Sequence, residues 1–148
     1  MSVRADILFN LATALKGISI DNGYSTDIAE VYPRPFTAEE IKNSPSPAIS
    51  IIDGPEEQAG NVAAYRRIRS GILLEGIIRQ GPTSPGGPTL SEDYNMFIAD
   101  LRECLHAANL GDNVIYHRLL DLTPVFAETW AYFTYTLQIV YYYPEASP

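Results

Sequence analysis

The longest patterned stretch of the chain lies near its end, where side chains alternate between two sides from Glu128 to Tyr143. A period of two, built from aromatic and β-branched residues, predicts a β-strand. One side carries Ala131, Phe133, Tyr135, Leu137, Ile139 and Tyr141, and the other carries Trp130, Tyr132, Thr134, Thr136, Gln138 and Tyr142. About fifteen residues at ~3.3 Å each span on the order of 50 Å. So long a strand must be central to a sheet or extend past its own domain.

A second long strand is predicted from Ala64 to Gln80 by the same alternation. One face carries Ile68, Ser70, Ile72, Leu74, Gly76 and Ile78, and the other carries Tyr65, Arg67, Arg69, Leu73, Glu75, Ile77 and Arg79. Shorter strands are expected at Ser25–Tyr32, Pro47–Asp53 and Val114–Leu122, with Pro124 breaking the chain before the terminal strand.

Two amphipathic helices flank these strands. Ser2 to Lys16 repeats apolar residues at helical spacing, and a second helix starts at Thr89 or Ser91 and ends before Gly111. Thr37 and Glu40 match a capping box, which is compatible with one or two helical turns or with a solvated turn. The polar segment Glu56–Ala63 is expected to be a mobile hairpin loop, and Gly81–Pro88 a Pro- and Gly-rich loop.

These elements predict one α+β domain over residues 1–148, with an antiparallel or mixed sheet of four to five strands and two main helices on one face. The other face is too apolar for water and too charged for a second core. Such mixtures are typical of surfaces that a partner buries. The candidate interface residues are Tyr65, Arg67, Arg69, Leu73, Ile77, Trp130, Tyr132 and Tyr142. The alternative is that loops 54–63 and 81–89 fold over this face.

Composition limits the partners. The 148 residues are 46% hydrophobic, so the chain can bury a core, and the formal net charge is −8. That charge argues against tight, sequence-independent binding to DNA. A single cysteine, Cys104, excludes an internal disulfide. No apolar run suggests an export signal or a membrane span, so a soluble protein made in the cytoplasm is expected.

No catalytic or metal constellation emerges from the sequence. Cys104 and His106 are two residues apart on a helix and point to different sides, and His117 lies in a strand. The paired carboxylates lie in loops or at helix starts, where solvation explains them. We therefore predict a non-enzyme without cofactor or metal.

The order of elements resembles the tail terminator, or tail completion, proteins of long-tailed bacteriophages. The resemblance covers nearly the whole chain and lies in element order and texture: a helix I-L-F-N-L-A-T-A-L, then G-Y-S-T-D-I-A-E-V-Y, P-A-I-S-I-I-D, Y-R-R-I-R-S-G-I-L-L-E-G-I-I-R, D-Y-N-M-F-I-A-D-L-R-E-C-L and a closing aromatic strand.

The resemblance implies a virion subunit that forms a ring, typically a hexamer, without catalytic residues. Such a ring caps the head-proximal end of the tail tube, stops tube growth and meets the head-completion proteins. In that role Glu56, Glu57 and Gln58 would form a tube- or lumen-facing loop whose acidic groups repel passing DNA. Two alternatives stay open: another neck or head–tail joining protein, and a monomeric domain that binds a small ligand on its aromatic face.

Overall fold

Two long antiparallel strands form the centre of the structure, which is a computed structural model. It describes residues 2–62, 65–81 and 89–144, without the side chains of residues 61, 62, 65 and 144. Strands β4 (Tyr65–Arg79) and β6 (Trp130–Pro144) pair along their whole length, with Arg79 opposite Trp130. These are the two strands that the alternation predicts.

The other strands extend this pair into a mixed sheet of six strands. β5 (Val114–Phe126) pairs antiparallel with β6, while β2 (Ala48–Ile52) and β3 (Glu56–Val62) pair antiparallel with successive parts of β4. β1 (Glu30–Tyr32) adds to β2 in parallel. The α+β class is confirmed, with one strand more than the four to five expected.

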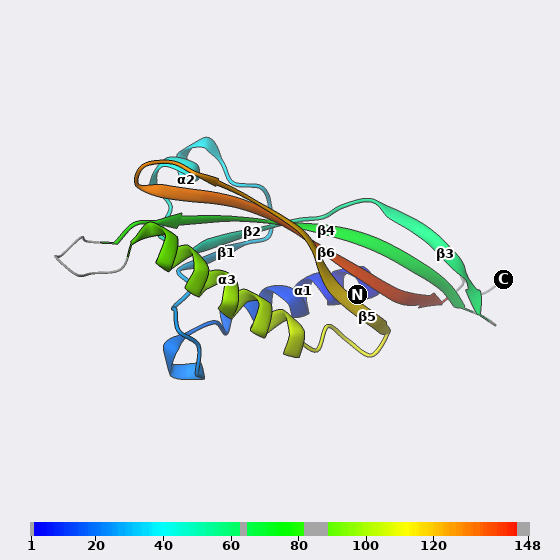
Figure 1. Ribbon diagram of the computed structural model, residues 1–148. Coiled ribbons are helices and arrows are strands. Elements are labelled where there is room, and N and C mark those ends of the chain that lie inside the picture. Colours follow the sequence, from blue (N-terminus) through cyan, green and yellow to red (C-terminus); the bar gives the residue numbers. More distant parts are fainter. Residues whose placement is uncertain (1, 63–64, 82–88, 145–148) are drawn as a thin grey trace.

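The two predicted helices lie against the same face of the sheet (Figure 1). α1 (Val3–Lys16) begins after Ser2, whose Oγ accepts a hydrogen bond from the Ala5 backbone N–H. α3 (Leu90–Ala107) is capped in the same way by Thr89. A 3₁₀ turn, η1 (Ile20–Asn22), follows α1, and the short helix α2 (Ala38–Asn43) lies on the opposite face of the sheet (Figure 1).

The main core lies between α1, α3 and the sheet face that they cover. Its fully buried side chains include Leu11, Leu15, Phe97, Leu101, Leu74, Phe133 and Leu137. Burying each of these side chains contributes roughly 1.5–3 kcal/mol. Gly76 has a packing role here, because a Cβ at that position would lie 2.1 Å from the ring of Phe133, its partner on β6.

Residues 56–62 form a strand, so the expected mobile loop at Glu56–Ala63 is wrong. They pair with β4 from Glu56 opposite Ser70 to Val62 opposite Tyr65, with one irregularity between Gln58 and Gly60. This polar sequence has low strand propensity. Its backbone pairs because the N-terminal half of β4 extends past the helices and leaves its own backbone groups to be satisfied there.

Pro124 does not break the chain, because β5 continues through it to Phe126. Proline lacks a backbone N–H, which an edge strand tolerates when that position faces away from the ladder. β5 is such an edge strand, since it ends the strand order of the sheet.

The first short strand is also shorter than predicted. Only Glu30–Tyr32 pairs, while residues 25 and 26 bind a side chain of α3. The buried carboxylate of Asp100 accepts the backbone N–H of Ser25 at 3.0 Å and the hydroxyl of Thr26. These hydrogen bonds hold residues 25 and 26 against α3 and away from the sheet, so strand pairing begins only at Glu30.

Candidate functional site

The sheet has an inner face, which α1 and α3 cover, and an outer face opposite to it. The register places Leu74 and Tyr135 on the inner face and Leu73 and Thr136 on the outer face. The outer face carries the residues that the sequence proposes as an interface, so the predicted division between the two faces of β4 and β6 is confirmed.

One end of the outer face is covered by the segment 33–47, which contains α2. Phe36 of this segment packs with Ala48 and Ile77, and Tyr32, Trp130 and Tyr132 pack around them. Ile77 is fully buried by the chain itself. Its proposed place at a partner interface is therefore wrong, because the sequence did not show that residues 33–47 return over this end of the sheet.

Arg79 fixes the segment 33–47 to the sheet. Its Nε donates to the Ser44 carbonyl at 3.1 Å, and its Nη2 donates to the carbonyls of Glu40 and Ile41. These carbonyls lie at the end of α2, where backbone carbonyls lack further partners within a helix, although Glu40 O also accepts the Ser44 backbone N–H at 2.8 Å. Arg79 is thus a C-terminal cap within the chain, and its charge is already engaged.

The start of α2 is fixed by the capping box that the sequence suggests. Thr37 Oγ1 accepts the Glu40 backbone N–H at 3.1 Å, and Glu40 Oε1 accepts the Thr37 backbone N–H at 2.9 Å. Arg34 donates to both oxygens of Glu40, at 2.6 and 2.9 Å. The hydrogen bonds from Arg34 and from the Thr37 backbone lower the pKa of Glu40 to about 2.

Trp130 and Tyr132 lie at the margin of the covered end and are half-buried. Burial and a hydrogen bond to Glu75 raise the pKa of Tyr132 to about 12. Glu75 lies on the outer face of β4, where its carboxylate accepts a hydrogen bond from the Tyr132 hydroxyl. These two aromatic residues therefore keep only part of their surface for a neighbour.

Within the described part of the chain, no segment covers the middle of the outer face. Leu73 is half-buried, and beside it a hollow of about 290 Å³ is lined by Pro55, Glu56, Glu57, Arg69, Gly71, Leu120, Thr136 and Gln138. Arg69 Nη1 contacts Glu57 Oε1 at 2.5 Å, and their side chains stay 44% and 63% exposed. An ion pair this exposed contributes little to stability, about 0–1 kcal/mol, so both groups remain available for contacts.

Beyond this hollow the strands β3, β4 and β6 extend past the helices as an arm (Figure 1). Arg67 and Tyr142 face each other on its outer side and are half-buried. The Nε of Arg67 is buried and has no hydrogen-bond partner among the described residues. The side chain of Tyr65 lies outside the described part of the chain.

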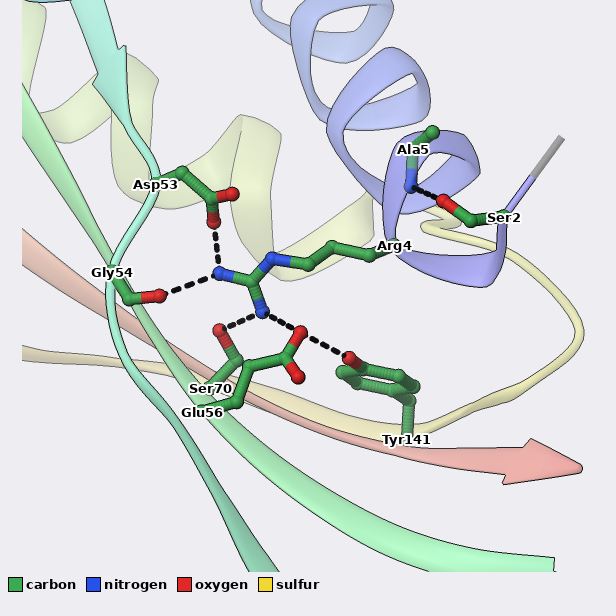
Figure 2. Close-up of polar contacts among 8 residues, drawn as sticks. All are labelled: Ser2, Arg4, Ala5, Asp53, Gly54, Glu56, Ser70 and Tyr141. Atoms are coloured by element: carbon green, nitrogen blue, oxygen red, sulfur yellow. Dashed lines mark hydrogen bonds and ion pairs between the residues drawn. The ribbon is translucent and has the colours of Figure 1, made fainter. Parts of the chain in front are cut away.

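The three residues of the proposed lumen-facing loop do not act together. All three are exposed on β3, but Glu56 binds Arg4 and Tyr141 while Glu57 pairs with Arg69. Figure 2 shows the guanidinium of Arg4, from the first turn of α1, held between Glu56, Asp53, Ser70 and the Gly54 carbonyl. Arg4 Nη1 lies 2.6 Å from Glu56 Oε1 and 2.6 Å from Ser70 Oγ, and Nη2 donates to Asp53 and to Gly54 O.

Tyr141 completes this cluster by donating its hydroxyl to Glu56 Oε1 at 2.8 Å. Burial and that bond raise the pKa of Tyr141 to about 12. Burial alone would lower the pKa of Arg4, yet the Asp53 and Glu56 carboxylates raise it above its ordinary value. The Arg4 cluster was missed from the sequence, although a cation in the first turn of a helix opposes the helix dipole and so signals a specific partner.

The cysteine and histidines do not form a reactive site. Cys104 is buried and its Sγ donates to the Ala14 carbonyl at 3.2 Å, while His106 is exposed. Burial raises the pKa of the Cys104 thiol. His117 Nε2 donates to the Leu105 carbonyl at 2.6 Å, which fixes the proton on that nitrogen because a carbonyl can only accept. Among the described residues no three His, Cys, Asp or Glu side chains gather as metal ligands.

No helix in the described ranges is long and apolar enough to cross a membrane. Neither a comparison with models of protein families nor a comparison with curated proteins found a match for this chain.

Proposed function

We propose that the protein is a structural virion subunit that forms a ring at the head-proximal end of a bacteriophage tail tube. The ring ends tube polymerisation and presents a surface to head-completion or neck proteins. The proposal rests on the resemblance of the sequence to tail terminator proteins and on the outer face of the sheet.

The observation that carries the proposal is the incomplete cover of that face. Residues 33–47 bury Ile77 at one end, while Leu73, Arg69 and the hollow beside them stay open. Half-buried apolar groups mixed with arginines are characteristic of protein–protein interfaces. A second copy is an occupant that explains why this surface is neither polar nor closed.

Charge supports an interface between copies over an interface with DNA. The chain has 18 acidic and 10 basic residues, so a neighbouring copy offers carboxylates to arginines such as Arg67 and Arg69. An acidic ring also lets DNA phosphates pass through its lumen without binding. If the contact joins the outer face to a different surface of the next copy, it is heterologous, and such contacts form a ring when the rotation between copies closes.

The test mixes purified protein with the tail-tube protein of the same phage and records assembly by negative-stain electron microscopy and light scattering. Rings at tube ends are expected for the unchanged chain. Arg67→Glu with Arg69→Glu should keep a native circular dichroism spectrum and abolish assembly. The substitutions replace two cations with two anions, which repel the carboxylates of the neighbouring copy.

A matched control carries Lys16→Glu with Lys42→Glu, which changes the net charge equally at exposed positions in α1 and α2. The control should assemble. If the arginine variant assembles as well as the control, the two arginines lie on a solvent-exposed surface that takes no part in assembly. If the unchanged chain forms no ring with the tube and no density at the neck of the particle, the proposed function is wrong.

A further inference from the structure

The outer strand of the sheet leaves a backbone edge unused. β5 ends the strand order, and among the described residues no strand pairs with the edge that faces away from β6. Its pairing with β6 is irregular between Val114 and Tyr116 and again between Leu120 and Leu122. The segment Tyr116–Leu120 between these irregularities pairs regularly. Alternate residues in it therefore direct their backbone N–H and C=O groups toward the unpaired edge.

A groove runs along this strand on the side of α3. It consists of two hollows of about 500 and 460 Å³ that share His106 and His117. One lies between β5 and the C-terminal half of α3, and the other between β5 and the connection at residues 108–111. Together they follow β5 from Val114 to Leu119, and six residues of extended chain measure about 20 Å.

The walls of the groove combine apolar and cationic groups. Leu105, Leu119 and Tyr135 supply apolar surface, while Arg102 and His106 supply charge or hydrogen-bond donors from successive turns of α3. Glu103 is the one carboxylate among the described lining residues. Among the lining residues the guanidinium groups of Arg102 and Arg118 outnumber this carboxylate, whereas the whole chain has a net charge of −8.

Arg102 is held in place for binding. Its Nε donates to the Tyr135 hydroxyl at 2.9 Å, and its guanidinium carbon lies 5.9 Å from the centre of that ring. The two terminal nitrogens make no hydrogen bond or ion pair within the described chain. A guanidinium with a fixed plane and free terminal donors suits a carboxylate, which it can bind through two parallel bonds.

We propose that this groove binds an extended, acidic segment of a partner protein, which adds a strand to the free edge of β5. The backbone of the segment pairs with Tyr116–Leu120, apolar side chains enter the hollows, and a carboxylate binds Arg102 and His106. Strand addition beside a helix uses main-chain hydrogen bonds for affinity and side-chain pockets for selectivity. The site lies at the edge of the sheet, so it is separate from self-association through the outer face.

The probe is a fluorescein-labelled eight-residue peptide with threonine at every odd position and valine and glutamate in turn at the even positions, so that valine and glutamate side chains share the face toward α3. It is compared with the same peptide carrying lysine for glutamate. Overall electrostatics favour the lysine peptide, because the protein is acidic. A preference for the glutamate peptide by about tenfold or more in Kd therefore reports the groove itself. Fluorescence anisotropy measures both affinities.

Amide chemical-shift changes in the unmodified protein locate the peptide, and residues 114–120 with the C-terminal half of α3 should move. Arg102→Gln with His106→Gln should weaken the glutamate peptide by about tenfold, whereas Lys42→Gln on α2 should change nothing. Arg102→Lys keeps the charge and should retain the preference for glutamate, even if the Gln variant proves unstable.

Three results overturn the proposal. They are no shift change at peptide concentrations of about 1 mM, shifts confined to another edge such as β3, and an equal or greater affinity for the lysine peptide.

Discussion

Arg4 Nη1 and Glu56 Oε1 lie 2.6 Å apart and join the first turn of α1 to the first residue of β3. The same guanidinium binds Asp53 and the Gly54 carbonyl, so it fixes the junction where the chain leaves β2 and enters β3. The arm begins at this junction. The Arg4 cluster therefore controls how the arm is held relative to the helices.

Replacing Arg4 by methionine should destabilise the protein by about 1–2 kcal/mol, because it leaves the two carboxylates without their cation. The estimate is at the low end since the side chains of Asp53 and Glu56 are 52% and 41% exposed. Urea unfolding measures the loss, and Arg4→Lys should recover part of it. An unchanged unfolding free energy, with unchanged amide exchange in β3, would show that the cluster is dispensable.

The raised pKa values of Tyr132 and Tyr141 predict a loss of stability in alkali. Their ordinary pKa of 10 applies to the unfolded chain, and the folded value of each is about 12. The unfolded chain therefore releases these protons first, so this stabilisation is present below pH 10 and is lost as the pH rises to 12.

The double variant Tyr132→Phe with Tyr141→Phe should flatten the fall of Tm between pH 10 and 12. Some slope should persist, because burial also raises the pKa of Tyr24 and Tyr94. A Tm profile as steep as that of the unchanged chain would contradict the assignment.

The single tryptophan, Trp130, reports whether the segment 33–47 stays on the sheet. The pKa of Glu40 is lowered from 4.5 to about 2, so its contribution is present above pH 4.5 and is lost as the pH falls toward 2. Trp130 emission should shift to longer wavelength over that range.

Glu40→Gln should weaken the dependence of the emission on acid, because the carboxylate that titrates in this range is gone. Arg34→Gln should act in the same direction because it removes the main cause of the lowered pKa. The segment is held by other contacts if both variants keep the acid response of the unchanged protein.

The alternation of the two long strands predicted which residues share a face, and for good physical reason. Ile72 and Leu73 are neighbours in sequence, yet a strand sends them to opposite faces, and the structure places Ile72 in the core. The candidate interface followed from the same pattern. What it could not show is which segment returns to cover Ile77.

The missed features depend on contacts between distant parts of the chain. β3 was unpredictable because Glu56, Glu57 and Gln58 have no apolar alternation, and only the exposed backbone of β4 makes them a strand. The partners of Arg4 lie about fifty residues away in sequence. Asp100 stands inside the apolar stripe of α3, and a carboxylate at a buried position signals a specific hydrogen-bond partner.

Gly76 and Phe133 test the packing of the inner face. Gly76→Ala should cost about 1–3 kcal/mol, because the new methyl group meets the Phe133 ring. Phe133→Leu alone also destabilises, but the double variant should be more stable than the sum of the two losses by at least about 0.5 kcal/mol. Purely additive losses in urea unfolding would mean that the ring does not lie over Gly76.

The accessibility of Leu73 in assembled tails tests the central claim, that a second copy covers the open outer face. Leu73→Cys can be labelled with a maleimide, because the native Cys104 is buried and should react slowly. We predict fast labelling of the free protein and strong protection at position 73 once rings cap the tube. Equally fast labelling before and after assembly would contradict the account, because the face would remain open in the ring.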